Sequence, residues 1–131
     1  MGAKAFILAA SLGAVMSVPM LAHHSFGSEY DSKKPIKFEN VVVTKVEWTN
    51  PHARFYVDVK DANGKVVNWN FELASPNVLK RMGWTRNSLK EGDHVTVEGS
   101  AAKDGANLAN AAAVTLADGK RVFARSGQDG Q

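Results

Sequence analysis

The most constraining feature of the sequence is a series of short segments in which apolar and polar residues alternate. Over 36–48 the apolar residues fall mainly on even positions, and Phe55, Val57 and Val59 continue the alternation. The pattern returns over 67–73. A period of two places successive side chains on opposite faces of a strand, so one face of each segment is expected to be buried. The pattern predicts three half-buried strands in an antiparallel meander.

Turn and cap residues divide the chain between these segments. Asn63-Gly64 is typical of a tight hairpin. Ser75-Pro76 predicts the start of a short helix, with Ser as the N-cap and Pro at the first helical position, and Gly83 predicts its end. Further strands are expected around Val95 and Val97, and then over 107–116 and 120–124, with 99–105 as a loop.

Three strands, a short helix and then two or more strands follow the order of an OB-type barrel, in which the helix closes one end. The sequence therefore predicts a mainly all-β fold: a small OB-like antiparallel barrel of five to six strands with one short helix between strands three and four. A small β-sandwich is the alternative. The expected organisation is a signal peptide at 1–22, an extended arm at 23–35, the barrel at 36–125 and a disordered tail at 126–131.

The first residues of the chain are typical of a cleavable secretion signal. Lys4 precedes an apolar stretch over 5–15, and Ala22 offers a small residue at the cleavage point. The apolar stretch is shorter than the ~20 residues that cross a bilayer. We expect cleavage after Leu21 or Ala22, and a mature protein that is periplasmic or secreted and has no membrane span.

Composition excludes several classes of function. The chain has no cysteine, which rules out disulfides, thiolate metal sites and cysteine catalysis. Its net charge is only +3, and basic residues are interleaved with acidic ones, whereas a nucleic-acid binder usually shows a basic run or face. Ser25 and Ser75 have no recognisable base and no Gly-x-Ser-x-Gly motif surrounds them. We expect neither an enzyme nor a nucleic-acid partner.

Two adjacent histidines, His23 and His24, follow the predicted cleavage point. Cleavage after Ala22 would make His23 the N-terminus, so that its α-amine and imidazole chelate one ion and His24 completes a planar set suited to Cu(II). The amine titrates near pH ~7.7–8.0, so a metal can displace its proton at neutral pH. Cleavage after Leu21 would make His24 the third residue of the mature chain. Cu(II) could then bind through the terminal amine, backbone nitrogens and the His24 imidazole. Both cuts favour Cu(II).

A further histidine, His52, lies at the expected turn between the first two strands, where Pro51 restricts the backbone. Loops at a barrel rim often carry binding groups, so His52 is the expected partner of the N-terminal pair. The predicted ligands for Cu(II), or for another divalent metal, are His23, His24 and His52. Three residues are expected to orient them: Glu47, Asn50 and Glu72.

The alternative is a metal-free module for protein interaction or self-assembly in the periplasm. Phe26 and Tyr30 in the expected arm are available as anchors. The arm could fold back on its own barrel, or it could dock on a partner protein or on a second copy to form an oligomer or filament.

Several motifs together resemble one bacterial family of small exported proteins, the domain of unknown function 6152 (DUF6152). They are His23-His24-Ser25-Phe26, Glu29-Tyr30-Asp31, the segment 45–52 that ends in Asn50-Pro51-His52, the segment 71–76, and Gly83-Trp84-Thr85-Arg86. The resemblance covers essentially all of the mature chain and implies an exported, OB-like domain without an established activity. Ala53-Arg54 stand where the family is expected to have bulkier apolar residues, so the surroundings of His52 are expected to differ.

Overall fold

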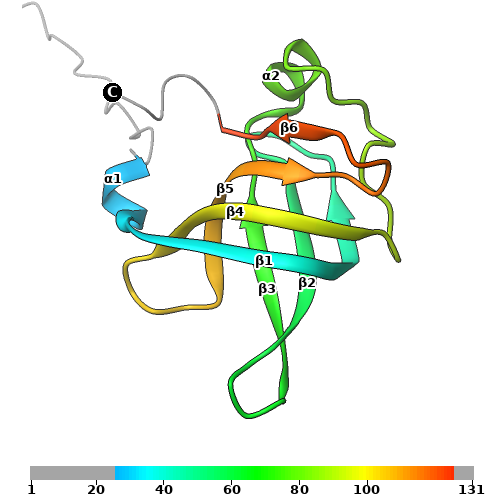
Figure 1. The fold of residues 1–131 in the computed structure, drawn as a ribbon. Helices are drawn as coiled ribbons and strands as arrows, with labels where there is room; N and C mark the ends of the chain where they lie inside the picture. Colours follow the sequence, from blue (N-terminus) through cyan, green and yellow to red (C-terminus); the bar gives the residue numbers. More distant parts are fainter. Residues whose placement is uncertain (1–25, 126–131) are drawn as a thin grey trace, which may run out of the picture.

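The strands of the computed structural model, which describes residues 26–125, lie in one six-stranded sheet (Figure 1). The elements in chain order are α1 (Phe26–Glu29), β1 (Tyr30–Glu47), β2 (Arg54–Lys60), β3 (Val66–Glu72), α2 (Pro76–Arg81), β4 (His94–Ala102), β5 (Leu108–Thr115) and β6 (Arg121–Phe123). The predicted signal peptide, His23, His24 and the predicted tail lie outside the described residues. No helix among residues 26–125 is long and apolar enough to cross a membrane.

Five of the strands close into a ring. The sheet order is β3-β2-β1-β4-β5-β6, and β3 also pairs with β5. The β3–β5 pairing is parallel, whereas the other pairings among the described strands are antiparallel. The predicted small barrel with a short helix between the third and fourth strands is confirmed, with the correction that its closing pair is parallel. A closed ring of one sheet replaces the β-sandwich alternative.

The first strand is longer than the alternation indicated. β1 begins at Tyr30, which pairs with Ala102 of β4, and Pro35 pairs with Ser100. Within the segment expected to be an extended arm, residues 26–35 are therefore a short helix followed by barrel strand from residue 30 onward. Alternation did not reveal this part of β1 because most of its side chains are exposed on both faces.

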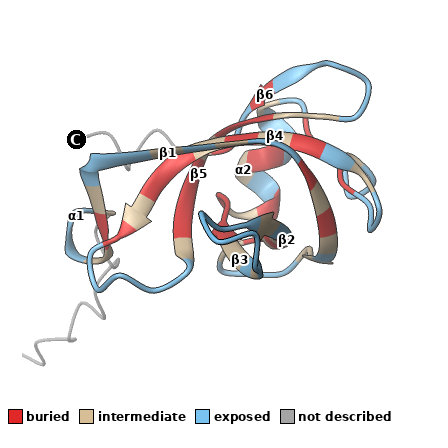
Figure 2. Ribbon diagram, turned by 60° about the horizontal axis from the view of Figure 1, so that its bottom comes forward, coloured by how far each residue is buried: buried red, intermediate tan, exposed pale blue. Residues whose placement is uncertain are grey.

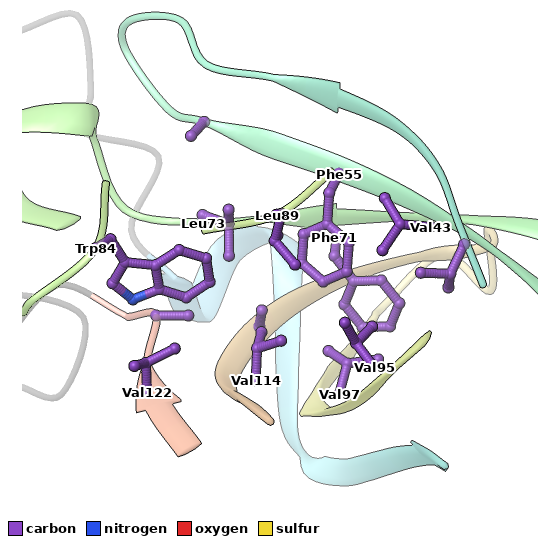
Figure 3. Packing of buried hydrophobic residues seen from close by; sticks show 14 of the residues in the cluster. Val43, Phe55, Phe71, Leu73, Trp84, Leu89, Val95, Val97, Val114 and Val122 are labelled. Atoms are coloured by element: carbon purple, nitrogen blue, oxygen red, sulfur yellow. The ribbon is translucent and has the colours of Figure 1, made fainter. Parts of the chain in front are cut away.

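The interior of the barrel is filled by the apolar faces that the sequence predicted. Phe55 and Phe71 are fully buried and stack with their ring centres 5.3 Å apart. Figure 3 shows them at the centre of the core, facing Val95 and Val97 of β4. Burying a side chain of this size contributes about 1.5–3 kcal/mol, so this core is the main source of stability in a chain without disulfides.

The helix α2 covers one end of the barrel (Figure 1). The Ser75 hydroxyl accepts a hydrogen bond from the Val78 backbone N–H at 3.3 Å, which confirms the predicted N-cap. Leu79 faces the core, and Trp84, after the helix, donates its indole N–H to the Phe123 carbonyl at 2.7 Å. The hairpin loop between β2 and β3 extends from the opposite end of the barrel.

The segment expected to be a loop over 99–105 is partly strand, since β4 continues to Ala102. The residues of this strand extension, 99–102, are small. A Cβ built on Gly99 would lie 2.2 Å from the Asn110 carbonyl oxygen. Gly99 lies within the strand, where the absence of a side chain permits the close approach of β4 to β5.

Candidate functional site

A buried carboxylate on the outer face of the barrel is the centre of the candidate site. Glu72 is the last residue of β3, and its neighbours Phe71 and Leu73 face the barrel interior, so its side chain points outward. Only 8% of Glu72 is exposed. Its Oε2 accepts a hydrogen bond from the Tyr30 hydroxyl at 2.6 Å and one from the Arg54 guanidinium at 2.9 Å. A buried charge is thus paired and hydrogen-bonded.

The imidazole of His52 lies beside the other oxygen of this carboxylate. His52 Nδ1 is 3.0 Å from the Leu73 carbonyl oxygen and 3.6 Å from Glu72 Oε1. A carbonyl oxygen only accepts, so Nδ1 carries a hydrogen and donates it. In the neutral ring the free lone pair then lies on Nε2. Because 41% of the His52 side chain is exposed, a ligand from outside can reach it. Histidines that ligate metals usually show this arrangement, in which the non-ligating N–H is held by a carbonyl or a carboxylate.

The residues that precede β1 are held against the same part of the barrel. The Phe26 and Tyr30 ring centres are 5.7 Å apart, and the Arg125 guanidinium lies 4.5 Å from the centre of the Phe26 ring. Arg125 also donates to Asn110 Oδ1 at 3.0 Å. The Lys103 ammonium donates to the Gly27 carbonyl oxygen. Residues 26–30 are therefore anchored to the barrel, and Tyr30 connects them to the cluster formed by Glu72, Arg54 and His52.

The three residues expected to orient the histidines lie in different surroundings. Glu72 adjoins His52, as described above. The Glu47 carboxylate instead binds the Lys45 ammonium at 2.8 Å and accepts from the Tyr56 hydroxyl at 3.5 Å. The hydrogen bond from Lys45 lowers the pKa of Glu47. Asn50 is exposed and its side chain has no hydrogen-bond partner among the described residues.

No group of three or more His, Cys, Asp or Glu side chains within 26–125 is placed to hold a metal ion. His52 contributes one imidazole, and the other predicted ligands, His23 and His24, lie outside the described residues. A metal site at His52 therefore needs ligands from beyond this part of the chain.

Sequence reasoning missed Arg54 and assigned Tyr30 only a possible anchoring role. The signal for Arg54 was present, because counting outward from the hairpin turn pairs Arg54 with Glu72. No local signal indicates Tyr30, since it is separated from Glu72 by 42 residues and meets it only after the barrel has closed.

The Tyr30 hydroxyl provides a test of this cluster in alkaline solution. Burial, followed by the hydrogen bond to Glu72, raises the pKa of Tyr30 far above its ordinary value of ~10. In a Tyr56→Phe variant, we expect the tyrosinate absorbance near ~295 nm to appear only as the protein unfolds. The folded state holds the proton more tightly, so the unfolding free energy should fall as pH rises above ~10. If Tyr30 ionises reversibly near that pH while the circular dichroism spectrum stays that of the folded protein, its burial beside Glu72 is wrong.

Comparison with known proteins identifies a family. The model of a family of unknown function (DUF6152) matches residues 12–111. No curated protein and no solved structure matches the chain.

Proposed function

Since the chain belongs to the DUF6152 family, whose function is unknown, we propose a function from the residues themselves. The protein is an exported small binding protein that binds Cu(II) through a processed N-terminus, His23 and His24, together with His52. The observation that carries the proposal is the orientation of His52, whose Nδ1–H is held by the Leu73 carbonyl while Nε2 stays available as a ligand.

The anchoring of the chain near residue 26 supports a shared site. Phe26 contacts Tyr30, and the Tyr30 hydroxyl binds the carboxylate that lies 3.6 Å from His52 Nδ1. Each residue spans at most ~3.6 Å of chain, so covalent geometry keeps the Cα of His24 within about 7 Å of the Cα of Phe26. His23 and His24 therefore precede, by two or three residues, a segment that contacts the hydrogen-bonded pair beside His52.

The chemistry of the available groups favours copper among common metals. Imidazole and amine nitrogens suit Cu(II), and a terminal amine with neighbouring imidazoles can form a planar chelate. The Glu72 carboxylate, held by Tyr30 and Arg54, lies next to the Nδ1–H of His52. The Leu73 carbonyl holds this N–H and orients the ring, and the adjacent carboxylate adds a negative charge that suits a cation bound at Nε2.

Titration of the purified, processed protein with Cu(II), followed by electron paramagnetic resonance, tests the proposal. Mass spectrometry first establishes the N-terminus of the sample. We expect His52→Ala to weaken Cu(II) binding by about ten-fold or more, the scale on which outer partners of metal-ligating histidines already act. A variant extended by one residue before the natural N-terminus should change the nitrogen coupling, because the chelating amine is displaced.

The matched control is His94→Ala, because His94 is exposed on β4 and its Nδ1 lies 3.2 Å from Asn40 Oδ1. This variant should bind Cu(II) as the parent does. If the parent does not bind, the metal function is wrong and the metal-free interaction module becomes the better interpretation. If His52→Ala and the extended variant both bind as the parent does, the composite site is wrong.

A further inference from the structure

An open groove lies between β1 and the β2–β3 hairpin, away from α2. The β1–β2 ladder extends only to the pair Val42 and Asp58, whereas β2 continues to Lys60. The two strands separate beyond this pair and enclose a groove of about 720 Å³. Figure 1 shows the hairpin extending past the rest of the barrel on this side, and Figure 2, turned toward this end, shows its loop exposed.

The groove has an apolar floor, most of which belongs to the core or packs against it. Phe38, Val41, Val59 and Val66 line it. Val66 is 53% exposed, one of two large hydrophobic side chains that are exposed among residues 26–125. The Phe38 ring packs edge-on against Trp69, with ring centres 5.1 Å apart, so the floor is formed before any ligand arrives. Apolar pockets of roughly 300–1,000 Å³ at barrel mouths are typical small-molecule sites.

The charged side chains at the rim differ in how they are engaged. Lys37 forms an ion pair with Glu39 at 3.2 Å. Asp58 accepts a hydrogen bond from the Asn68 side chain on β3 at 2.9 Å. Lys60 makes no ion pair or hydrogen bond through its ammonium to any residue that the structure describes. Asp58 keeps its negative charge, because the Asn68 amide is neutral, so the rim carries two cationic and two anionic side chains. Lys60 is the one whose charged group has no partner among the described residues, which leaves its ammonium available to a ligand.

We propose that this groove binds an amphiphilic small molecule with an apolar body and a single anionic end. The apolar body lies over Phe38, Val41, Val59 and Val66, where it removes exposed hydrophobic surface from water. The anionic end, a carboxylate or a group of similar size, contacts the Lys60 ammonium. This site is separate from His52 and does not depend on metal binding.

The test is a nuclear magnetic resonance titration of the ¹⁵N-labelled, processed protein with dodecanoate below its micelle concentration. We expect saturable shifts of backbone amides over 37–42 and 58–66. Dodecyltrimethylammonium has the same chain length and the opposite charge, and it should bind more weakly. Lys60→Gln should weaken dodecanoate binding about two- to five-fold, the scale of one exposed ion pair. Val66→Ser should weaken binding of both compounds.

The matched control is Lys65→Gln, because Lys65 is exposed in the hairpin turn but does not line the groove. It should leave dodecanoate binding unchanged, and the amide spectrum of each variant shows whether it is folded. Shifts that do not saturate or that lie elsewhere would overturn the proposal. Equal binding of the cationic compound, or equal effects of Lys60→Gln and Lys65→Gln, would do the same. Concentration-dependent shifts of these amides without ligand would assign the groove to a second copy of the chain instead.

Discussion

Gly99→Ala is expected to lower the unfolding free energy by about 3 kcal/mol or more, which corresponds to a fall in Tm of about 12–24 °C. A Cβ at this position would lie 2.2 Å from the Asn110 carbonyl oxygen and 3.1 Å from its carbon. Both atoms belong to the backbone of β5, so they cannot move aside as a flexible side chain would. The strain falls where β4 pairs with β5, next to the strand pair that closes the barrel. Calorimetry or urea unfolding measures the loss.

Gly27→Ala is the matched control for this substitution. It makes the same chemical change at a glycine whose added Cβ would meet no atom within 4 Å. We expect its unfolding free energy to stay within about 0.5 kcal/mol of the parent. If the unfolding free energy of Gly99→Ala equals that of Gly27→Ala, the strands β4 and β5 do not lie as close at Gly99 as described.

Glu72→Ala is expected to lower the unfolding free energy by about 3 kcal/mol. The substitution removes the acceptor of the Tyr30 hydroxyl, and Tyr30 is only 2% exposed, so its hydroxyl loses its bond without gaining free access to water. The Arg54 guanidinium loses its carboxylate partner at the same time. Urea unfolding measures the change, provided that the slope with urea concentration matches that of the parent.

The control for Glu72→Ala is Glu39→Ala on β1. Glu39 also pairs with a cation, Lys37, but its side chain is 72% exposed, so its removal should cost at most about 0.5 kcal/mol. Adding Tyr30→Phe to the parent and to Glu72→Ala completes a double-mutant cycle. The tyrosine substitution should cost much less in the Glu72→Ala background, because the shared hydrogen bond is already absent. Additive costs would mean that the hydrogen bond between Tyr30 and Glu72 contributes no stability of its own. Equal losses for Glu72→Ala and Glu39→Ala would mean that the buried cluster contributes no more than an exposed ion pair.

Local signals predicted the parts of the fold that depend on neighbouring residues. Ser75-Pro76 begins α2, and the Asn63-Gly64 turn connects β2 to β3, because caps and turns are formed by residues a few positions apart. Alternation also placed Phe55 and Phe71 inside the barrel. It missed the last residues of β4, since Gly99 and the small residues after it carry no alternating pattern.

The candidate site was predicted only in part, because local signals do not show which distant residues meet. The position of His52 at the turn between β1 and β2 followed from the sequence, and so did Glu72 as a neighbour that could orient it. Glu47 was an equal choice at that level, but the structure engages it with Lys45 and Tyr56. Sequence spacing cannot distinguish Glu47 from Glu72 as the neighbour of His52, because this depends on the face of a curved strand on which each side chain lies.

The sequence by itself determined a strand-rich domain without disulfides, with a short capped helix after the third strand and an aromatic core. These properties follow from residue periodicity and from chemistry within a few residues. Only the tertiary structure decided that β3 pairs with β5, that Tyr30 binds Glu72, and that the groove beside Lys60 opens where β1 and β2 separate. Each of these joins residues far apart in the chain, and their proximity depends on how the closed barrel packs as a whole.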